Sequence, residues 1–443
     1  MPDSPQTFTA SGEKSLLQEA VEIAFLALIF SLGFMRPNFS FGTASATITD
    51  ILFLITTGLW LASLIARINS FRFDNFYWLL ALYGSGLTLS ALFSVNVAAS
   101  LRRLPIEIYL IGLSVLTCGI VNSTAMLKRV AFAWLGAALV ASIIGAAAIG
   151  SFYLNWTNPI SDFALHHYGS LPPGNYPRIQ GTFEYPSLLC NYLTVGLMFV
   201  FIGLKLEWWD MKAAIAATTC ISIAIAFTFT PGIGGAMLAA AMWYWVVREK
   251  RVAGRLALGA GMLAFIAFLI ISTFTPIATS TSPFYFDIGG WRIDPTQRLL
   301  AWMQAGNTFL GNAIFGKGLG QPVASVHFLA PSGQHQILSD AHNVFLNVAG
   351  QSGLAGLIPL ILICWAMLRR SMSVKRDGSL RWASCGLGIA FFSVLIAQGA
   401  VGSFENSRHI WVLIGLILAV ERLTRSGSVE QISSVKQARY DNE

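Results

Sequence analysis

Charged residues are scarce in this chain: Asp, Glu, Lys and Arg make up only 11% of its 443 residues, whereas hydrophobic residues make up 55%. A typical soluble domain has about 25% charged residues. The mean hydropathy is correspondingly high, at +0.63. This composition excludes an ordinary soluble protein and indicates an integral membrane protein.

Cysteine is also rare, and the five cysteines, at positions 118, 190, 220, 364 and 385, all lie in apolar runs. None is placed for a disulfide in an oxidising compartment, so we interpret them as small core residues. The sequence lacks the Cys/His spacing of a zinc site, the acidic loop of a calcium site and a glycine-rich nucleotide turn. We therefore expect no metal and no cofactor. The net charge of +7 is attributed to anchoring at the inner membrane surface, so nucleic-acid binding gains no support.

Apolar runs long enough to span about 30 Å of hydrocarbon recur along nearly the whole chain. They are continuous and do not alternate with period two, which favours helices over a barrel. The predicted helices are 17–35, 48–65, 76–93, 105–122, 130–150, 186–204, 213–229, 233–247, 256–273, 341–368, 383–401 and 409–421. We therefore expect an all-α membrane protein with about 12 transmembrane helices, formed by one polytopic domain over residues 1–443.

The pair 213–229 and 233–247 is predicted as two helices because Thr230-Pro231-Gly232 supplies a turn between them. With this map, all but eight of the 28 basic residues lie on the side of both termini. Cytoplasmic loops of membrane proteins are enriched in Lys and Arg. We expect cytoplasmic termini, a cytoplasmic tail at 423–443, and a long loop with short helices at 274–340 on the opposite side.

Eight basic residues lie on the side that the positive-inside bias disfavours. They are Arg36, Arg102, Arg103, Arg178, Arg292, Arg298, Lys317 and Arg408. Guanidinium groups are planar, stay charged at any relevant pH and bind phosphate oxygens through paired hydrogen bonds. Their number on this side predicts a ligand that carries phosphate, such as a pyrophosphate head group.

His342 follows the long loop and opens the predicted helix 341–368. An imidazole can gain and lose a proton near neutral pH, which arginine cannot do. Helix starts near Pro295 and His342 would add the positive ends of helix dipoles. Together these residues predict a site where a phosphate-activated group leaves while a hydroxyl attacks. Gly350 and Gly353 in the same helix predict close helix packing.

Simpler interpretations stay open at this point. His342 could be a polar interfacial or capping residue, and His409, which heads the last predicted helix, occupies a similar position. Arginines beside membrane ends often contact lipid phosphates. That interpretation fits Arg36, Arg102, Arg103 and Arg408 best.

Three motifs occur in order. They are Arg178-x-x-Gly181-Thr182-Phe183, Arg298 followed by Trp302 and the turn Phe315-Gly316-Lys317-Gly318-Leu319-Gly320, and His342-Asn343-x-Phe345-Leu346 with Gly350 and Gly353-x-x-Gly356. This order resembles the O-antigen ligase (WaaL) family of the O-antigen ligase and polymerase superfamily. The resemblance covers residues from about 170 to 360.

The resemblance implies a GT-C-type glycosyltransferase of lipopolysaccharide biosynthesis. Such an enzyme moves a glycan from undecaprenyl pyrophosphate to lipid A–core oligosaccharide at the periplasmic face of the bacterial inner membrane, without a metal. On this model Arg178 and Arg298 hold the pyrophosphate and His342 acts as the base, with inversion at the anomeric carbon. Further candidates for substrate binding are Arg292, Lys317, Asn343, Gln297, Arg102 and Arg103.

The sequence also departs from the family. Relatives have a Ser-Arg pair where this chain has Thr230-Pro231, and an Asn-Pro-Asn-like run where it has Glu184-Tyr185-Pro186. An O-antigen polymerase or a protein O-oligosaccharyltransferase would use the same donor and the same site. A lipid-linked glycan transporter is the alternative from another class, although carriers place polar groups near the middle of the membrane.

Overall fold

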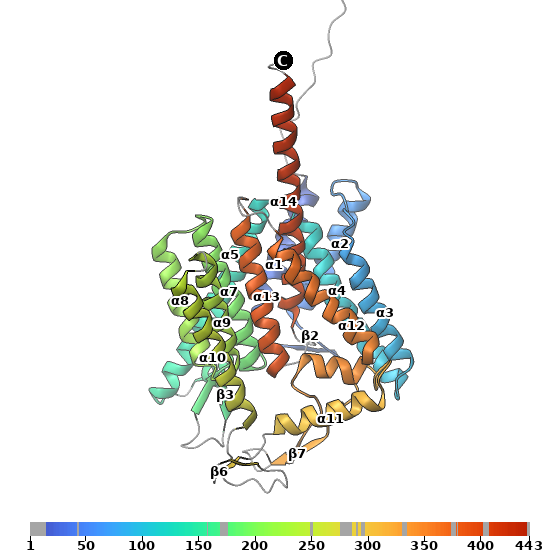
Figure 1. The fold of residues 1–443 in the computed structure, drawn as a ribbon, viewed down its shortest axis with the longest axis vertical. Coiled ribbons are helices and arrows are strands. Elements are labelled where there is room, and N and C mark those ends of the chain that lie inside the picture. The colour runs from blue at the N-terminus through green and yellow to red at the C-terminus, as the bar shows by residue number, and fades with distance from the viewer. Residues whose placement is uncertain are drawn as a thin grey trace, which may run out of the picture.

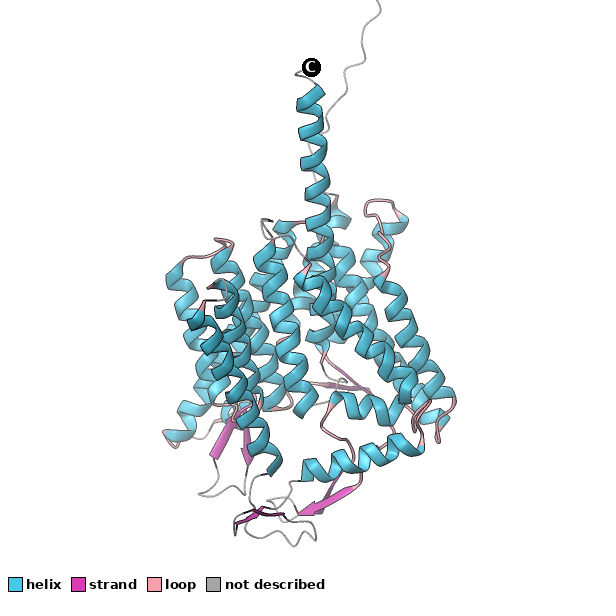
Figure 2. Cartoon of the chain, viewed as in Figure 1, coloured by secondary structure: helices cyan, strands magenta, loops and turns pink. Residues whose placement is uncertain are grey.

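The computed structural model describes residues 15–41, 44–156, 158–168, 176–248, 251–274, 286–288, 291–293, 297–329, 335–373, 378, 380–401 and 407–440. Helices dominate this part of the chain, and the strands form small two-stranded hairpins (Figure 2). The helices are α1 (Leu16–Ser31), α2 (Ile48–Ile65), α3 (Phe76–Leu92), α4 (Val97–Ile120), α5 (Thr124–Tyr153), α6 (Pro159–Ala164), α7 (Pro186–Lys205), α8 (Met211–Ala226), α9 (Gly232–Val247), α10 (Val252–Phe274), α11 (Gln297–Gly311), α12 (Val344–Met372), α13 (Arg381–Val401) and α14 (Arg408–Tyr440).

The strands pair antiparallel as β1–β2, β3–β4, β5–β6 and β7–β8. Their bounds are β1 (Phe39–Phe41), β2 (Ala44–Ala46), β3 (Leu165–Tyr168), β4 (Tyr176–Ile179), β5 (Phe286–Ile288), β6 (Trp291–Ile293), β7 (Val326–Leu329) and β8 (His335–Leu338). The hairpins β3–β4, β5–β6 and β7–β8 lie with α11 at one end of the helix bundle, which we name the loop end (Figure 1). The last part of α14 projects from the opposite end, which we name the tail end (Figure 1).

Each of the twelve predicted ranges overlaps a helix, and α6 and α11 are short helices in the connecting loops. Six of the helices, α2, α4, α5, α7, α10 and α12, are long and apolar enough to cross a membrane by length and composition. The structure is therefore that of an all-α, membrane-embedded protein. The long loop was expected to contain short helices, and its described residues contain one helix, α11, which begins at Gln297.

The surface of the bundle is apolar, as expected for a protein surrounded by lipid. Leu54 on α2 and Leu256 and Leu263 on α10 are about 70% exposed, at 70%, 70% and 69%. In contrast, α7 and the first part of α14 are buried along most of their length. Burying large apolar side chains at the centre while exposing others at the rim suits a hydrocarbon solvent and not water.

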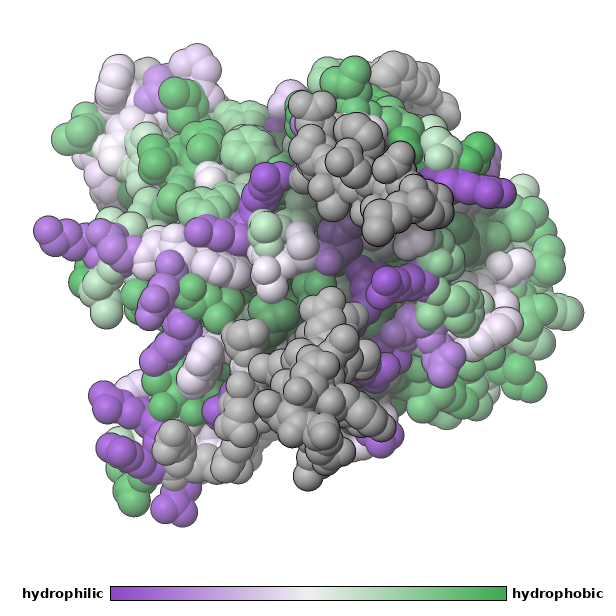
Figure 3. All heavy atoms as spheres, turned by 90° about the horizontal axis from the view of Figure 1, so that it is seen from above, coloured by the Kyte–Doolittle hydropathy of each residue, from purple (hydrophilic) through white to green (hydrophobic). Residues whose placement is uncertain are grey.

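Side chains at the tail end are more polar than those at the rim of the bundle (Figure 3). Arg370 of α12 donates to Asp74 before α3 (Nη2 to Oδ1, 2.8 Å) and to Glu421 of α14 (Nη1 to Oε2, 2.8 Å). Burial raises the pKa of the Asp74 carboxyl, but hydrogen bonds from Arg370 and the Phe76 amide and the charge of Arg370 outweigh it, so the pKa is lowered overall. This network joins three helices at one end of the bundle.

The predicted break between α8 and α9 is confirmed. The α8 helix ends at Ala226 and α9 begins at Gly232, with Pro231 at the position before the first helical residue. Because proline cannot donate a backbone hydrogen bond, it suits a helix start and not a helix interior. The turn places the carbonyls of Phe227 and Thr228 at the loop end, where β4 contacts them.

The predicted helix 341–368 needs two corrections. It begins at Val344, and its backbone is not helical at Gly353, where φ is 60° and ψ is −155°. A Cβ at Gly353 would overlap the backbone of Ile314, so the close approach predicted for this glycine occurs against a loop and breaks the helix. The first part of α12 consequently lies across the loop end, and the rest rises through the bundle (Figure 1).

Candidate functional site

His342 lies in a turn that polar side chains hold from both sides. The Asn343 side chain caps α12 by accepting from the Leu346 amide (Oδ1 to N, 3.1 Å). The Asn347 side chain accepts from the Ala341 amide (Oδ1 to N, 2.8 Å). His342 therefore precedes the cap and does not open the helix, and it has a φ of 45°. That conformation is uncommon for a residue other than glycine and is maintained by these contacts.

Asp340 pairs with His342. Its Oδ1 lies 2.6 Å from the imidazole Nδ1 and accepts from the His342 amide at 2.5 Å. A carboxylate at Nδ1 holds the ring in one orientation and favours the tautomer with the proton on Nδ1, which leaves the Nε2 lone pair as the base. Sequence reasoning missed Asp340, although the spacing Asp-x-His beside a predicted catalytic histidine was a usable signal.

The charge of Asp340 is maintained by its partner. Burial raises the pKa of this carboxyl, but hydrogen bonds from the His342 ring and amide and attraction to the imidazolium lower it more, so the pKa lies below the usual value of 3.8. The Asp340 carboxylate is therefore ionised at neutral pH and can stabilise a positive charge on His342.

Tyr185, which caps α7, lies near this pair. Burial raises the pKa of its phenol, and the negative charges of Glu184 and Asp340 raise it further. The segment that links the predicted Arg178 motif to α7 thus lies close enough to Asp340 for the charge of this carboxylate to act on Tyr185. Tyr185 was not predicted as a site residue, because nothing in the sequence indicates that these two segments meet.

Arg298 belongs to α11, which packs beside His342. Trp302, one turn after Arg298, packs with Leu346 against a small buried cluster of Ala305, Val323 and Ala341. Residues four apart lie on the same face of a helix. The face of α11 that carries Arg298 is therefore directed towards the turn that holds His342, as the prediction of a shared site requires.

Arg178 lies on another side of the loop end. Its Nε donates to the Thr228 carbonyl (2.9 Å), and the Ile179 amide donates to the Phe227 carbonyl (2.9 Å), so β4 is joined to the α8–α9 turn. The hairpin β3–β4 lies below α9, whereas α11 lies below α12 (Figure 1). Arg178 thus approaches the loop end from the opposite side to Arg298.

Lys317 has a structural role in the glycine-rich turn. Its Nζ donates to the Pro322 carbonyl (2.9 Å) and its amide donates to the Gly350 carbonyl (2.8 Å). Gly318, at a φ of 114°, lies where a Cβ would overlap Ser94. The turn therefore packs between the first part of α12 and the segment before α4. The ammonium group of Lys317 is directed to its own loop.

The other predicted residues are distributed as follows. Asn343 is the helix cap described above, Arg102 is exposed on α4, and Arg103 of the same helix lines a cavity treated below. Arg292 pairs through its backbone with Asp287 in β5–β6, and Gln297 is the first residue of α11. The side chains of these last two lie outside the part that the structure describes.

The competing histidine is inaccessible. His409 is 3% exposed and lies against the Tyr192 ring, with centroids 6.2 Å apart, whereas the side chain of His342 is 39% exposed. Arg36 and Arg408, which also fitted lipid phosphate, contact protein groups. Arg36 donates to the Phe163 carbonyl (Nη1, 3.1 Å), and Arg408 binds Asp50 (Nη2 to Oδ1, 2.9 Å). Of these two histidines, His342 is thus the one that a substrate can reach.

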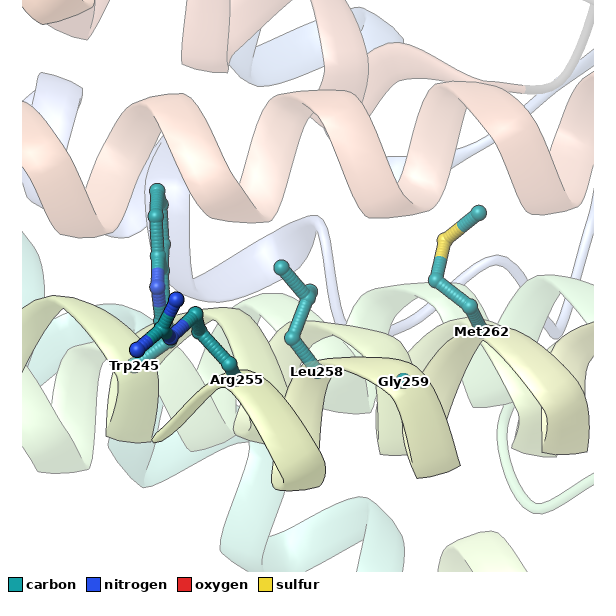
Figure 4. Close-up of a pocket in the computed structure, with 5 residues that line it drawn as sticks. All are labelled: Trp245, Arg255, Leu258, Gly259 and Met262. Atoms are coloured by element: carbon teal, nitrogen blue, oxygen red, sulfur yellow. The ribbon is translucent and has the colours of Figure 1, made fainter. Parts of the chain in front are cut away.

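A cavity of about 710 Å³ lies along α10, beside Trp245 of α9 (Figure 4). It is lined by Trp245, Arg255, Leu258, Gly259 and Met262. Its walls are mostly apolar, and the exposed side of α10 borders it, so it is a groove open to lipid. It contains none of the predicted site residues.

Within the described ranges, the structure holds no group of three or more His, Cys, Asp and Glu residues placed to bind a metal ion. The chain matches no model of a known protein family. It also matches no curated protein.

Proposed function

We propose that this protein is an O-antigen ligase, a GT-C-type glycosyltransferase that moves a glycan from undecaprenyl pyrophosphate to a hydroxyl of lipid A–core oligosaccharide. On this proposal the loop end faces the periplasm, the tail end faces the cytoplasm, and the membrane is the bacterial inner membrane. The observation that carries the proposal is the Asp340–His342 pair, with 2.6 Å between carboxylate and imidazole. It provides a base at the end of the bundle that also holds the predicted arginines.

The proposed reaction is a single displacement. The acceptor hydroxyl gives its proton to Nε2 of His342 while its oxygen attacks the anomeric carbon of the donor. The bond between this carbon and the pyrophosphate oxygen breaks, and the pyrophosphate leaves with the bonding electrons. Asp340 balances the positive charge that forms on His342, as carboxylates do in other base-assisted reactions. One displacement at one carbon inverts its configuration.

The leaving pyrophosphate requires positive partners. Arg298 would contact it from α11, beside His342, and Arg178 would contact it from the side of the α8–α9 turn. Fixed guanidinium groups in a site with little water stabilise developing negative charge strongly. Relatives have an arginine in the α8–α9 turn that this chain lacks. In this chain Arg178 of β4 would supply a guanidinium group there, since it contacts the turn at Thr228.

The location of the ionisable groups favours an enzyme over a transporter. Although α12 is broken at Gly353, as helices of carriers often are, Asp340, His342 and Arg298 lie at the loop end. Carriers bind their substrates near the middle of the membrane, between the two halves of the bundle. A site at one membrane face suits chemistry between a lipid-linked donor and a second lipid on the same face.

Reconstitution of the purified protein with lipid-linked glycan and lipid A–core tests this proposal. We expect glycan-modified lipid A–core that forms equally well with a chelator present. Longer donor glycan in place of this product would identify a polymerase, and modified Ser or Thr of an added protein would identify an oligosaccharyltransferase. Movement of donor between leaflets without any new linkage would identify a transporter. Each of these three results would overturn the proposal.

A further inference from the structure

A second cavity, of about 360 Å³, lies at the loop end and includes one predicted residue, Arg103. Ligand pockets commonly measure about 300–1,000 Å³, so this one suits a small group. Its walls come from the end of β2, the first two turns of α2, residues 103–109 of α4, the start of α14 and the loops that hold Asn38 and Glu184. They include Asn38, Asp50, Arg103, Tyr109, Glu184 and Arg408.

The charges of this cavity balance. It has two carboxylates, Asp50 and Glu184, and two guanidinium groups, Arg103 and Arg408. Arg408 binds both oxygens of Asp50 (2.9 and 3.1 Å) and donates to the Tyr109 hydroxyl (3.1 Å). Two carboxylates repel phosphate, and the paired arginine offers it little net attraction. The lining therefore suits a ligand without net charge.

The cavity offers planar hydrogen-bonding groups beside aromatic rings. Asn38 donates to the Glu184 carboxylate (Nδ2 to Oε1, 3.1 Å), which fixes the direction of that group. The rings of Phe53 and Tyr109 meet edge to face, with centroids 4.6 Å apart. Carboxylates, amides and guanidinium groups form hydrogen bonds to hydroxyl groups and fix their orientation. An aromatic ring packs against C–H groups. This combination suits the hydroxyls and C–H groups of a sugar ring.

Two observations relate the cavity to the segments around His342. Glu184 in its wall precedes Tyr185, and the pKa of the Tyr185 phenol is raised by burial and by the charges of Glu184 and Asp340. On the other wall, Arg103 packs against Gly320, whose amide donates to the Gln351 side chain in the first part of α12 (N to Oε1, 3.1 Å). The cavity is thus connected to the first part of α12, which begins two residues after His342, and Arg178 lies elsewhere, at the α8–α9 turn.

We infer that this cavity binds an uncharged sugar unit of the acceptor and so presents the attacking hydroxyl to His342. The inference rests on the proposed glycan transfer and adds to it a place and a charge preference for the acceptor. The donor pyrophosphate, which needs unbalanced positive charge, binds outside this cavity, to Arg298 and Arg178. Donor and acceptor thereby meet at the histidine from different sides.

Sugar binding can be measured without donor or turnover. Saturation-transfer NMR on the full-length protein in detergent would use methyl glycosides of neutral hexoses, with glucose 6-phosphate as the charged probe. We expect the neutral glycosides to bind and glucose 6-phosphate to bind about tenfold more weakly. Ala46→Phe places a ring in the cavity and should abolish binding of the glycosides. Ala62→Phe, on the exposed side of α2, is the matched control and should bind as the wild type does.

A smaller substitution tests the cavity with less risk of misfolding. Tyr109→Phe removes one hydroxyl and should weaken glycoside binding about two- to tenfold, the usual effect of one hydrogen bond. Ile106→Trp fills the cavity from its other wall and replaces Ala46→Phe if that variant does not fold. Tighter binding of glucose 6-phosphate, or unchanged binding in the folded filled variants, would overturn the inference. Glycoside binding without any transfer in the reconstituted system would instead contradict the proposed function and leave the cavity assignment intact.

Discussion

Asp340→Asn is the substitution that isolates the role of the carboxylate. Asparagine has nearly the same shape as aspartate but no negative charge, and its amide group can present an N–H to Nδ1 of His342. The bond replaced is short, at 2.6 Å, and joins the carboxylate to the imidazole. The ring would then lose the partner that selects its tautomer and the charge that stabilises its protonated form.

The size of the effect follows from the kind of bond that is lost. Hydrogen bonds to charged groups contribute about 1.5–3 kcal/mol, which corresponds to about 10- to 150-fold in rate. The side chains of Asp340 and His342 are 33% and 39% exposed, so solvent screens part of the interaction. We therefore expect the lower part of this range, a fall of about 10- to 50-fold in kcat.

Transfer kinetics in proteoliposomes would measure this effect. The turnover rate should fall while the KM for the lipid-linked donor stays unchanged, because Asp340 acts through His342 and not on the donor. Asp162→Asn, an exposed aspartate of α6 at the loop end, is the matched control and should behave as the wild type does. A folded Asp340→Asn enzyme whose kcat lies within about twofold of the wild type would refute the reasoning.

Three further predictions concern the arginines, the broken helix and the tail-end network. Arg298→Lys and Arg178→Lys keep the charge but lose the paired hydrogen bonds, so the KM for the donor should rise about tenfold, while Arg129→Lys at the tail end leaves it unchanged; equal KM values would contradict pyrophosphate binding. Gly353→Ala should lower the free energy of unfolding by about 3 kcal/mol or more through strain and overlap with Ile314, whereas Gly259→Ala, which has open space around it, should not; unfolding in denaturant distinguishes them. Asp74→Asn should lower the melting temperature through loss of the Arg370 contact, worth about 1–3 kcal/mol. Because the folded-state pKa of Asp74 is depressed, its contribution is fully present above the ordinary value of 3.8 and is lost as the pH falls from 3.8 through the lower folded-state pKa. The melting temperatures of variant and wild type should therefore converge over that fall in pH, and a constant difference would be the contrary result.

Much of the helical framework could be predicted from apolar runs, because the membrane forces each spanning segment to satisfy its own backbone hydrogen bonds. The break between α8 and α9 was also predictable, since Pro231 provides a local signal. The break in α12 was not. Gly353 follows Gly350-Gln351-Ser352, but a glycine inside a helical pattern does not by itself mark a break. What interrupts the helix is a loop more than thirty residues earlier, around Ile314.

The candidate site was predictable only in part, for the same reason. His342 and Arg298 could be assigned to one membrane face from charge and spacing, and the structure places the helix of Arg298 beside the turn of His342. The Asp-x-His spacing pointed to Asp340, but the contact itself depends on a turn with a positive φ at His342, which the amino-acid types do not specify. The cavity lined by Asp50 and Arg408 brings together four segments that are remote in sequence. The ion pair between these two residues could therefore not be predicted from the sequence.

The most direct test of the central claim is the rate of a single round of glycan transfer by His342→Ala, compared with His327→Ala. His327 is an exposed histidine of β7 at the same end of the bundle, so its loss controls for histidine removal alone. Removal of a general base typically costs about 100- to 10,000-fold, and we expect His342→Ala to lose at least the lower figure while His327→Ala transfers at the wild-type rate. Transfer by folded His342→Ala at the wild-type rate would contradict the assignment of His342 as the base.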